Sequence, residues 1–310
     1  MTQTHRDGIE RVILAQAGGL DTSIAIPWLA DTYRAEIIAV TIDLGQRKEW
    51  LEEVRDRALA TGAVRAHVVD VRDEFARDYL IRGLKAGLFR HDPAAMVEAL
   101  ARPILAQTLV AIAGIEEAHA VAHGDRGGRG GAALATAVRA LDPALILLAV
   151  PATMSTPVED RAEIARVATT FPDEPAYVDV AMQRGAPTGI NGVAMPWPDL
   201  VASLDILARA HGVGPSPLGA LDVAHQALEK ETISSDAERF GIGIANEYLR
   251  MLHDGSWFSL LRQALDACVD KIQERVGGSV RLKLFKGECT VVECHASAPA
   301  PPVIIPVIKG

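Results

Sequence analysis

The 310-residue sequence has few cysteines, few aromatic residues and no long apolar run. Its three cysteines, Cys268, Cys289 and Cys294, form no CxxC pair and no Cys/His cluster with zinc spacing, so neither a disulfide framework nor a cysteine metal site is expected. The longest apolar stretch, Ala144–Val150, is far shorter than the roughly 20 residues that cross a bilayer. With a polar first segment, 1–11, these features predict a cytoplasmic protein with no membrane partner.

Positive charge is also scarce. The chain has 31 Lys and Arg against 40 Asp and Glu, which gives a formal net charge of −9. An acidic chain repels a phosphate backbone, so nucleic acid is not an expected partner. The nine histidines form no HExxH pattern, and the sequence predicts no metal site of its own.

Aliphatic residues are abundant. Hydrophobic residues make up 49% of the chain and aromatic residues only 5%, a composition typical of packed strands and helices and not of disordered chains. The length favours two domains, each large enough for its own core.

The first half of the chain alternates short β-branched runs with amphipathic segments, the pattern of repeated βαβ units. It predicts an α/β fold in which residues 1–171 form a parallel-sheet nucleotide-binding domain. Such sheets bind ligands beyond the carboxyl ends of their strands, here in the loops after Ala15, Asp43, His123 and Val150. The predicted strands are Arg11–Ala15, Glu36–Asp43, Ala66–Val71, Ala118–His123 and Leu145–Val150, and the predicted helices are Ser23–Tyr33, Glu49–Thr61, Arg72–Leu88, Met96–Glu117 and Ala132–Leu141.

The second half loses this alternation and predicts a smaller α+β domain over residues 172–297. The dipeptide Lys286-Gly287 between two β-branched runs is a hairpin signal. The last segment, 298–310, is a proline-rich tail. The other predicted elements are a helix at Val158–Thr170, strands at Tyr177–Met182 and Gly185–Gly192, a helix at Asp199–His211, one helical stretch from Leu221 to Arg275 interrupted near Gly255, and hairpin strands at Ser279–Phe285 and Cys289–Cys294.

The segment after the first predicted strand is the most informative. Two adjacent glycines let the backbone approach an anion, and the free amides at the start of the next helix attract negative charge. The segment has no Walker lysine, and on spacing alone an ordinary strand-to-helix turn is the alternative. The residues of this predicted phosphate loop are Ala15, Gln16, Ala17, Gly18, Gly19, Leu20, Asp21, Thr22 and Ser23.

This loop resembles the pyrophosphate-binding loop of N-type ATP pyrophosphatases, and a series of further motifs is similar in the same order to the argininosuccinate synthase family. The resemblance covers nearly the whole chain. The motifs include IDLGQ at 42–46, ALATGA at 58–63, ALARP at 99–103, AVAHG at 120–124, GING at 189–192, HGVG at 211–214, GSWFS at 255–259 and VRLKLFKG at 280–287.

The resemblance implies an adenine nucleotide α-hydrolase-like domain followed by a synthetase and multimerisation domain, reduced here, in a homo-oligomer, either dimer or tetramer. In the family, ATP adenylates the ureido oxygen of citrulline with release of pyrophosphate, and the amine of aspartate then displaces AMP. ATP is therefore the expected cofactor, with Mg²⁺ that Asp21 or Asp43 would help to position. Ile42 and Gly124 fall where the family contacts adenosine. No catalytic residue is assigned.

Several residues depart from the family pattern around ATP. Ala17 stands in place of a serine, Gln16 in place of an aromatic residue, and Pro27 interrupts the following helix. A hydrogen bond to a charged phosphate contributes on the order of 1.5–3 kcal/mol, so weaker ATP binding is expected. Pro27 also deletes one backbone donor and can bend the helix.

The expected acceptor site departs further. Asp125-Arg126-Gly127-Gly128-Arg129-Gly130-Gly131 replaces the TGKGND-like run that supplies ligands to both amino acids in the family, and the tyrosine and Ser/Thr before the ALARP motif that hold citrulline are missing. Asp125, Arg126 and Arg129 are the candidate substrate-binding residues, since arginine pairs well with carboxylates and phosphates. A flexible, solvated glycine loop is the alternative.

Three functions fit these observations. The first is an ATP-dependent, AMP- and pyrophosphate-forming C–N ligase or adenylating enzyme with an amino-acid-like acceptor other than citrulline. The second is a diverged argininosuccinate synthase in arginine biosynthesis. The third is a noncatalytic homologue that binds nucleotide or acts as a scaffold.

Overall fold

The computed structural model describes residues 9–16, 22–90, 92–124, 129–151, 171–214 and 216–297. The chain divides into two compact units, which alternate along the sequence. The first comprises 1–75, 101–167 and 251–258, and the second comprises 76–100, 168–250 and 259–310. The domain boundaries expected from the sequence, 1–171 for the nucleotide-binding domain and 172–297 for the α+β domain, stay a prediction. The helix expected at Val158–Thr170 and the tail 298–310 lie outside the described residues.

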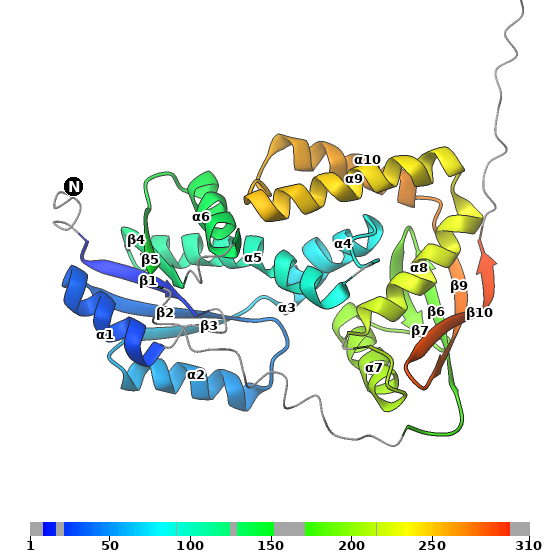
Figure 1. Ribbon diagram of the computed structural model, residues 1–310, viewed down its shortest axis with the longest axis horizontal. Coiled ribbons are helices and arrows are strands. Elements are labelled where there is room, and N and C mark those ends of the chain that lie inside the picture. The colour runs from blue at the N-terminus through cyan, green and yellow to red at the C-terminus, as the bar shows by residue number, and fades with distance from the viewer. Residues whose placement is uncertain are drawn as a thin grey trace, which may run out of the picture. The chain divides into compact units, whose positions relative to one another are not determined.

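A five-stranded parallel sheet forms the core of the first unit, as the sequence predicts. Its strand order is β3-β2-β1-β4-β5, and helices cover both faces (Figure 1). Val12, Ile13 and Leu14 of the central strand are fully buried, because a strand with helices on both sides has no solvent face. The elements are β1 Arg11–Ala15, α1 Thr22–Tyr33, β2 Glu36–Asp43, α2 Lys48–Ala60, β3 Arg65–Asp70, β4 Ala120–Gly124, α6 Arg129–Leu141 and β5 Ile146–Val150.

The prediction of a single helix at Arg72–Leu88 is wrong, because the segment is divided into three helical pieces. The segment consists of α3 Arg72–Glu74, a π-helical turn labelled η1 at Phe75–Leu80 and α4 Ile81–Lys85. Phe75, Ala76, Tyr79 and Leu80 are all buried and form one face of the segment.

Helix α5, Pro93–Ile115, is the one helix among the described residues that is long and apolar enough to cross a membrane by composition. Leu100, Ala106 and Leu109 are fully buried, and half of the most apolar window is buried inside the fold. The helix therefore has the burial of a core helix.

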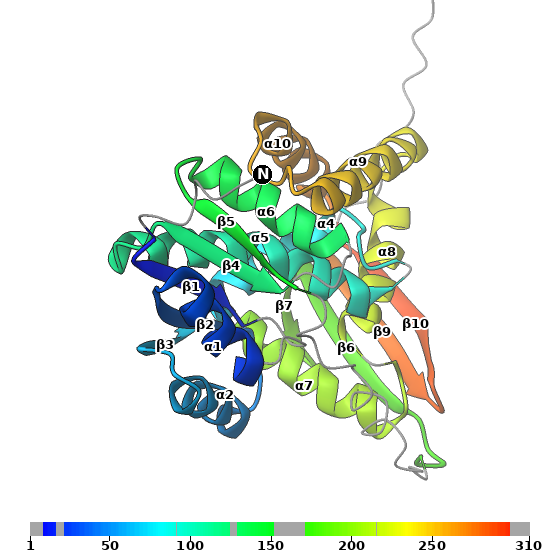
Figure 2. The same cartoon turned by 60° about the vertical axis from the view of Figure 1, so that its left-hand side comes forward.

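The second unit contains a five-stranded antiparallel sheet of order β10-β9-β6-β7-β8 (Figure 2). The predicted hairpin joins β9 and β10, and Lys286 and Gly287 both have positive φ, as a tight two-residue turn requires. The strands are β6 Ala176–Gln183, β7 Ala186–Ile190, β8 Val193–Ala194, β9 Gly278–Phe285 and β10 Glu288–Ala296, and the helices are α7 Trp197–Ala210, α8 Leu218–Thr232, α9 Ser235–Asp254 and α10 Leu260–Gln273.

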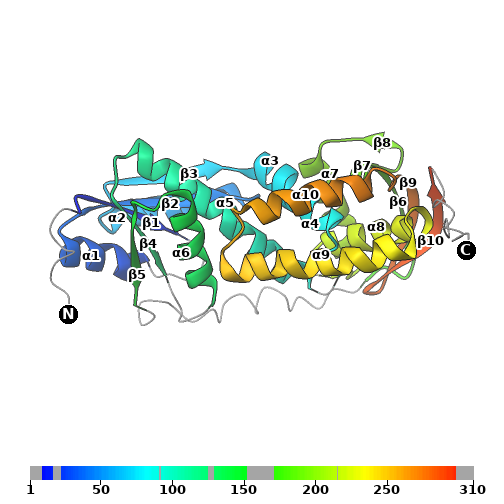
Figure 3. The same cartoon turned by 90° about the horizontal axis from the view of Figure 1, so that it is seen from above.

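The helical stretch expected from Leu221 to Arg275 has a second interruption, which the sequence did not predict. Ile233 is extended, with φ −114° and ψ 156°, and ends α8. The Ser234 hydroxyl then accepts a hydrogen bond from the amide of Ala237, which starts α9. Helices α9 and α10 lie side by side in opposite directions (Figure 3).

Candidate nucleotide site at the carboxyl ends of β1 and β4

The strand order reverses between β1 and β4, because the chain continues from β1 to β2 on one side and returns to β4 on the other. In open α/β sheets the crevice at this switch point binds ligands. Ala15 ends β1 and Gly124 ends β4, and both residues belong to the predicted ATP set. Gly124 is exposed, so the sheet edge at this point is open to solvent.

Gln16 is the first residue after β1 and is 9% exposed. Its backbone amide donates to the carbonyl of Val40 at 2.9 Å, and its side-chain Oε1 accepts from the hydroxyl of Thr41 at 2.8 Å. The side-chain Nε2 is buried and has no hydrogen-bond partner among the described residues. A buried donor without a partner is costly, so this amide fits a ligand that accepts hydrogen bonds, as phosphate or adenine does.

Helix α1 begins at Thr22 and has no acidic residue in its first turn, so nothing in that turn opposes an anion at its amino end. Residues 17–21 and the side chains of Thr22 and Ser23 lie outside the described part of the site. Pro27 is exposed, and the segment stays helical from Thr22 to Tyr33 around it. Pro27 therefore does not end the helix.

The residues of the IDLGQ motif form hydrogen bonds with one another at the end of β2. Ile42 is buried, and Asp43 Oδ1 accepts the amide of Gly45 at 2.8 Å. Gln46 Oε1 accepts the amide of Leu44 at 2.6 Å. Asp43 Oδ2 lies 3.6 Å from Arg72 Nε. Both oxygens of Asp43 therefore already have partners in the protein.

The glycine run after β4 is shorter than the sequence predicts. Helix α6 begins at Arg129, whereas the sequence predicts a loop over 129–131 and a helix start at Ala132. The guanidinium of Arg102, from the ALARP motif, covers this first turn: a β-carbon on Gly130 would lie 3.4 Å from Arg102 Nε. Asp125, Arg126 and the side chain of Arg129 lie outside the described residues. Arg102 was not among the predicted site residues. The ALARP motif that contains it was the sequence signal that could have indicated it.

The GSWFS segment supports α6 from a distant part of the sequence. Gly255 has φ +75°, and a β-carbon there would overlap the carbonyl oxygen of Ala133 in α6. Trp257 is 1% exposed and, with Arg102 and Ala137, lines a small cavity beside the helix. The close approach at Gly255 therefore holds the helix that follows the expected acceptor loop.

A charged cluster at the opposite edge of the sheet has a structural role. Glu116, 2% exposed, accepts hydrogen bonds from Arg65 and His67, both at 2.7 Å. Burial by itself raises the pKa of Glu116, but these two hydrogen bonds outweigh it and hold the pKa below its ordinary value of 4.5. The folded state therefore prefers the ionised carboxylate.

Acidification should therefore cost this cluster its stabilising effect. Because the folded pKa is lowered, the contribution is complete above about pH 4.5 and is lost as pH falls through the folded value. The Glu116→Gln variant should lose about 2 kcal/mol of unfolding free energy at pH 7 and show a smaller loss on acidification. Urea unfolding of both proteins at pH 7 and pH 4 measures this, and equal pH dependence would contradict it.

The described residues contain no group of three or more His, Cys, Asp or Glu side chains that could hold a metal ion. Mg²⁺ commonly binds through substrate phosphates, water and one or two carboxylates, and it does not require a protein cage. The site as described is that of an α/β nucleotide-binding protein: an open sheet edge at the switch point, a buried amide donor and a helix amino terminus.

Comparison with known proteins gives the family. The model of the arginosuccinate synthase N-terminal HUP domain matches residues 11–168, and that of the C-terminal domain matches 215–299. The chain is similar to the argininosuccinate synthases of Caldanaerobacter subterraneus, 32% identical over 94% of this chain and 86% of the relative, and Carboxydothermus hydrogenoformans, 34% identical over 90% and 86%. The chain belongs to the argininosuccinate synthase family, a family of ATP-dependent ligases.

The same matches show that the chain is reduced. The alignment with the Caldanaerobacter protein extends over 357 residues, more than the 310 residues of this chain, so the relative has internal residues that are absent here. Residues 169–214 belong to neither family match.

Proposed function

We propose that this protein is an ATP-dependent C–N ligase that adenylates an oxygen of an amino-acid-like acceptor, releases pyrophosphate and then exchanges AMP for an amine. The observation that carries the proposal is the glycine loop between β1 and α1 at the switch point, in a chain of the argininosuccinate synthase family. An amide-like oxygen is a poor leaving group until it carries AMP. Holding both substrates in one site makes the second step effectively unimolecular.

ATP would bind along the loop from Ala15 to Ser23, with its adenosine near Ile42 and Gly124. The amides after Gly18 and the start of α1 would meet the phosphates. The Gln16 amide supplies a buried donor next to the position where Ala17 lacks a hydroxyl. Mg²⁺ would arrive with the phosphates. Since Asp43 is already engaged by Gly45 and lies near Arg72, we assign the helping role to Asp21, the other predicted carboxylate.

We further propose that the acceptor is not citrulline. Support comes from the sequence of the segment 125–131, in which aspartate, arginine and glycine replace the family's threonine, asparagine and aspartate. Asp125, Arg126 and Arg129 would contact an acceptor with its own carboxylate or phosphate. Argininosuccinate synthesis itself is the second candidate, and the 32–34% identity to curated synthases over at least 90% of the chain favours it. The cytoplasmic location and the homo-oligomeric state stay predictions.

Calorimetry and product analysis separate these candidates. ATP with Mg²⁺ should bind, and citrulline with aspartate should yield no AMP, whereas a panel of ureido and amide compounds with an amine should yield AMP and pyrophosphate. AMP from citrulline and aspartate at ordinary enzyme rates would replace the first candidate with the second. Absence of ATP binding at millimolar concentration would favour a noncatalytic homologue.

The Gln16→Glu variant tests the proposed role of the buried amide. Glutamate keeps the oxygen that Thr41 contacts but replaces the Nε2 donor with negative charge near the phosphates. ATP affinity should fall by about tenfold or more, which corresponds to at least 1.4 kcal/mol. Calorimetry measures the affinity. The control is Thr41→Val, which removes the neighbouring hydroxyl and should lower stability while leaving ATP affinity within about threefold.

A further inference from the structure

Strand β10, Glu288–Ala296, forms an exposed edge of the antiparallel sheet in the second unit (Figure 2). It pairs with β9 on one side, and among the described residues no strand pairs with its other side. Six of its nine residues are exposed and none is buried. Such an edge presents a row of unpaired backbone N–H and C=O groups that can pair with a further strand.

The middle of β10 is apolar. Val291 and Val292 are 40% and 48% exposed. Proteins commonly protect such edges with lysine or proline, and β10 contains neither. The strand does contain a bulge, since Val292 is skipped in the pairing with β9. A bulge can turn an edge away from other strands, but here it also changes which side chains share a face.

The bulge brings the two cysteines of β10 to one face. Cys289 lies opposite Leu284 of β9, and Cys294 lies opposite Val280. Leu284 and Val280 are both fully buried and are four residues apart, so they share the face of the sheet on which α8 packs. The two cysteines therefore share this face although they are five residues apart, a spacing that a regular strand places on opposite faces.

Glu288 and His295 share the other face in the same way. They lie opposite Phe285 and Ser279 of β9, which are six residues apart and therefore on one face. Both Glu288 and His295 are exposed. An acidic and a basic side chain thus lie near the two ends of the strand, on the same face.

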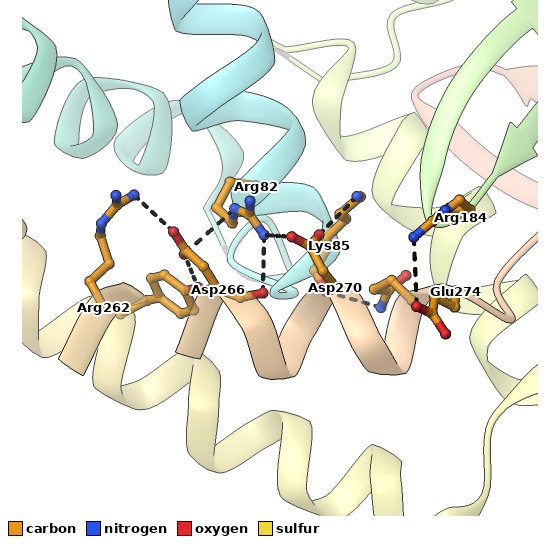
Figure 4. A network of polar contacts seen from close by, with 9 residues as sticks. Arg82, Lys85, Arg184, Arg262, Asp266, Asp270 and Glu274 are labelled. Atoms are coloured by element: carbon orange, nitrogen blue, oxygen red, sulfur yellow. Dashed lines mark hydrogen bonds and ion pairs between the residues drawn. The ribbon is translucent and has the colours of Figure 1, made fainter. Parts of the chain in front are cut away.

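The carboxylate of Glu288 has no side-chain partner within the described residues of its own chain. Charged groups between α4 and α10 of the same unit differ, because Arg82 and Lys85 contact Asp270 at 2.9 and 3.2 Å (Figure 4). The ring of His295 lies 3.7 Å from a carboxylate oxygen of its own chain, beyond hydrogen-bond distance. Both end groups of β10 are therefore available to a partner.

A second copy of β10 complements these features when the two strands pair antiparallel about a twofold axis between Val291 and Val292. Glu288 then lies opposite His295 of the partner subunit, and the two half-buried cysteines of one strand lie opposite those of the other. The members of each of these pairs come from one face, as opposite residues of a sheet do. The exposed valines of both strands meet at the axis.

The neighbouring registers complement less well. With the axis through Val292, residues from different faces would lie opposite one another. With the axis between Thr290 and Val291, Glu288 would lie opposite Glu293 of the partner subunit, and like charges directly opposite are unfavourable. With the axis one position beyond Val292, that valine would lie opposite the same carboxylate.

We propose that two copies of this chain associate through β10, with the strands antiparallel and the twofold axis between Val291 and Val292. The two five-stranded sheets then form one continuous sheet. Symmetric pairing satisfies the backbone groups of both edges and covers the valines of both copies, as an isologous interface does. The interface is independent of the ligase function proposed above, because it uses no residue assigned there to ATP or the acceptor.

Sedimentation velocity of the full chain tests the proposal. At about 50 µM the protein should form a dimer or a larger assembly with an even number of copies, since interfaces commonly reach micromolar affinity. Val292→Lys places a lysine at the centre of the interface and should weaken association at least about tenfold. Val193→Lys is the matched control, because Val193 is 59% exposed at the opposite edge of the same sheet, and it should leave association within about twofold of the wild type.

A charge exchange tests the register. His295→Glu sets carboxylates opposite each other on both sides of the axis and should weaken association about tenfold. Adding Glu288→Lys to this variant restores opposite charges and should bring the Kd back to within about threefold of the wild-type value. In one chain these two positions are about 23 Å apart along an extended strand, so the recovery can act only between copies. Circular dichroism checks that each variant folds.

Three results would contradict the proposal. A wild type that stays monomeric at this concentration, with the edge open or covered by the chain's own tail, 298–310, would overturn it. An assembly that Val292→Lys leaves intact would form through another surface and would overturn it as well. Failure of Glu288→Lys to recover the association lost in His295→Glu would refute the register.

Discussion

Replacing Gly19 with valine should abolish ATP binding while leaving the fold intact. The glycine pair lies in the segment between the end of β1 at Ala15 and the start of α1 at Thr22. A phosphate held by backbone amides needs close approach of the chain, and a branched β-carbon prevents it. We expect ATP affinity to fall by roughly 100-fold or more, which corresponds to at least about 2.7 kcal/mol.

Calorimetry with ATP and Mg²⁺ measures this loss, and urea unfolding checks the fold. Because Gly19 falls between Ala15, where β1 ends, and Thr22, where α1 begins, the unfolding free energy should change by less than about 1 kcal/mol. Gly114→Ala is the control: it lies in α5 with open space around its β-carbon and should bind ATP like the wild type. ATP binding retained by Gly19→Val would show that the nucleotide binds elsewhere.

The second large effect concerns stability. Gly255→Val should destabilise the protein by about 4 kcal/mol or more, through two separate costs. Valine strongly disfavours φ +75°, and its β-carbon would overlap the carbonyl oxygen of Ala133 in α6, which backbone cannot easily yield. The buried Trp257 two residues later would lose its packing if the turn moved.

Chemical denaturation of the wild type, Gly255→Val and Gly114→Ala measures these differences. Gly114→Ala should gain roughly 0.5–1 kcal/mol, since alanine is the better helix former and meets no atom there. A loss below about 1 kcal/mol in Gly255→Val would mean that the GSWFS turn is free to move away from α6. The conclusion that the contact at Gly255 holds α6 in place would then be wrong.

The strands were the most predictable elements. β1 and β2 match the predicted Arg11–Ala15 and Glu36–Asp43 residue for residue, since each is rich in Val and Ile and begins with a charged residue. The interruption at Ile233 had a signal, the Ser234-Ser235-Asp236 run that favours a helix start, but no glycine or proline marked it. The π-helical turn at Phe75–Leu80 had no such signal in the sequence.

The sequence predicted the position of the site better than the side-chain contacts that determine its chemistry. The loop after Ala15 could be placed from the glycine pair and the alternation of strands and helices. The orientation of the Gln16 side chain depends on its hydrogen bond with Thr41, which is 25 residues away in the sequence. The contact of Gly255 with α6 joins residues more than 120 positions apart. Such long-range pairs carry no local pattern, so only the fold reveals them.

Nucleotide product analysis tests the central claim most directly. The wild type and Gly19→Val would be incubated side by side with ATP, Mg²⁺ and a panel of ureido and amide acceptors, each with an amine donor, and the products separated by chromatography. We predict AMP and pyrophosphate in equal amounts from the wild type with at least one acceptor, and neither from the variant. ADP and phosphate as products, or equal AMP formation by the two proteins, would contradict an adenylating ligase that uses this loop.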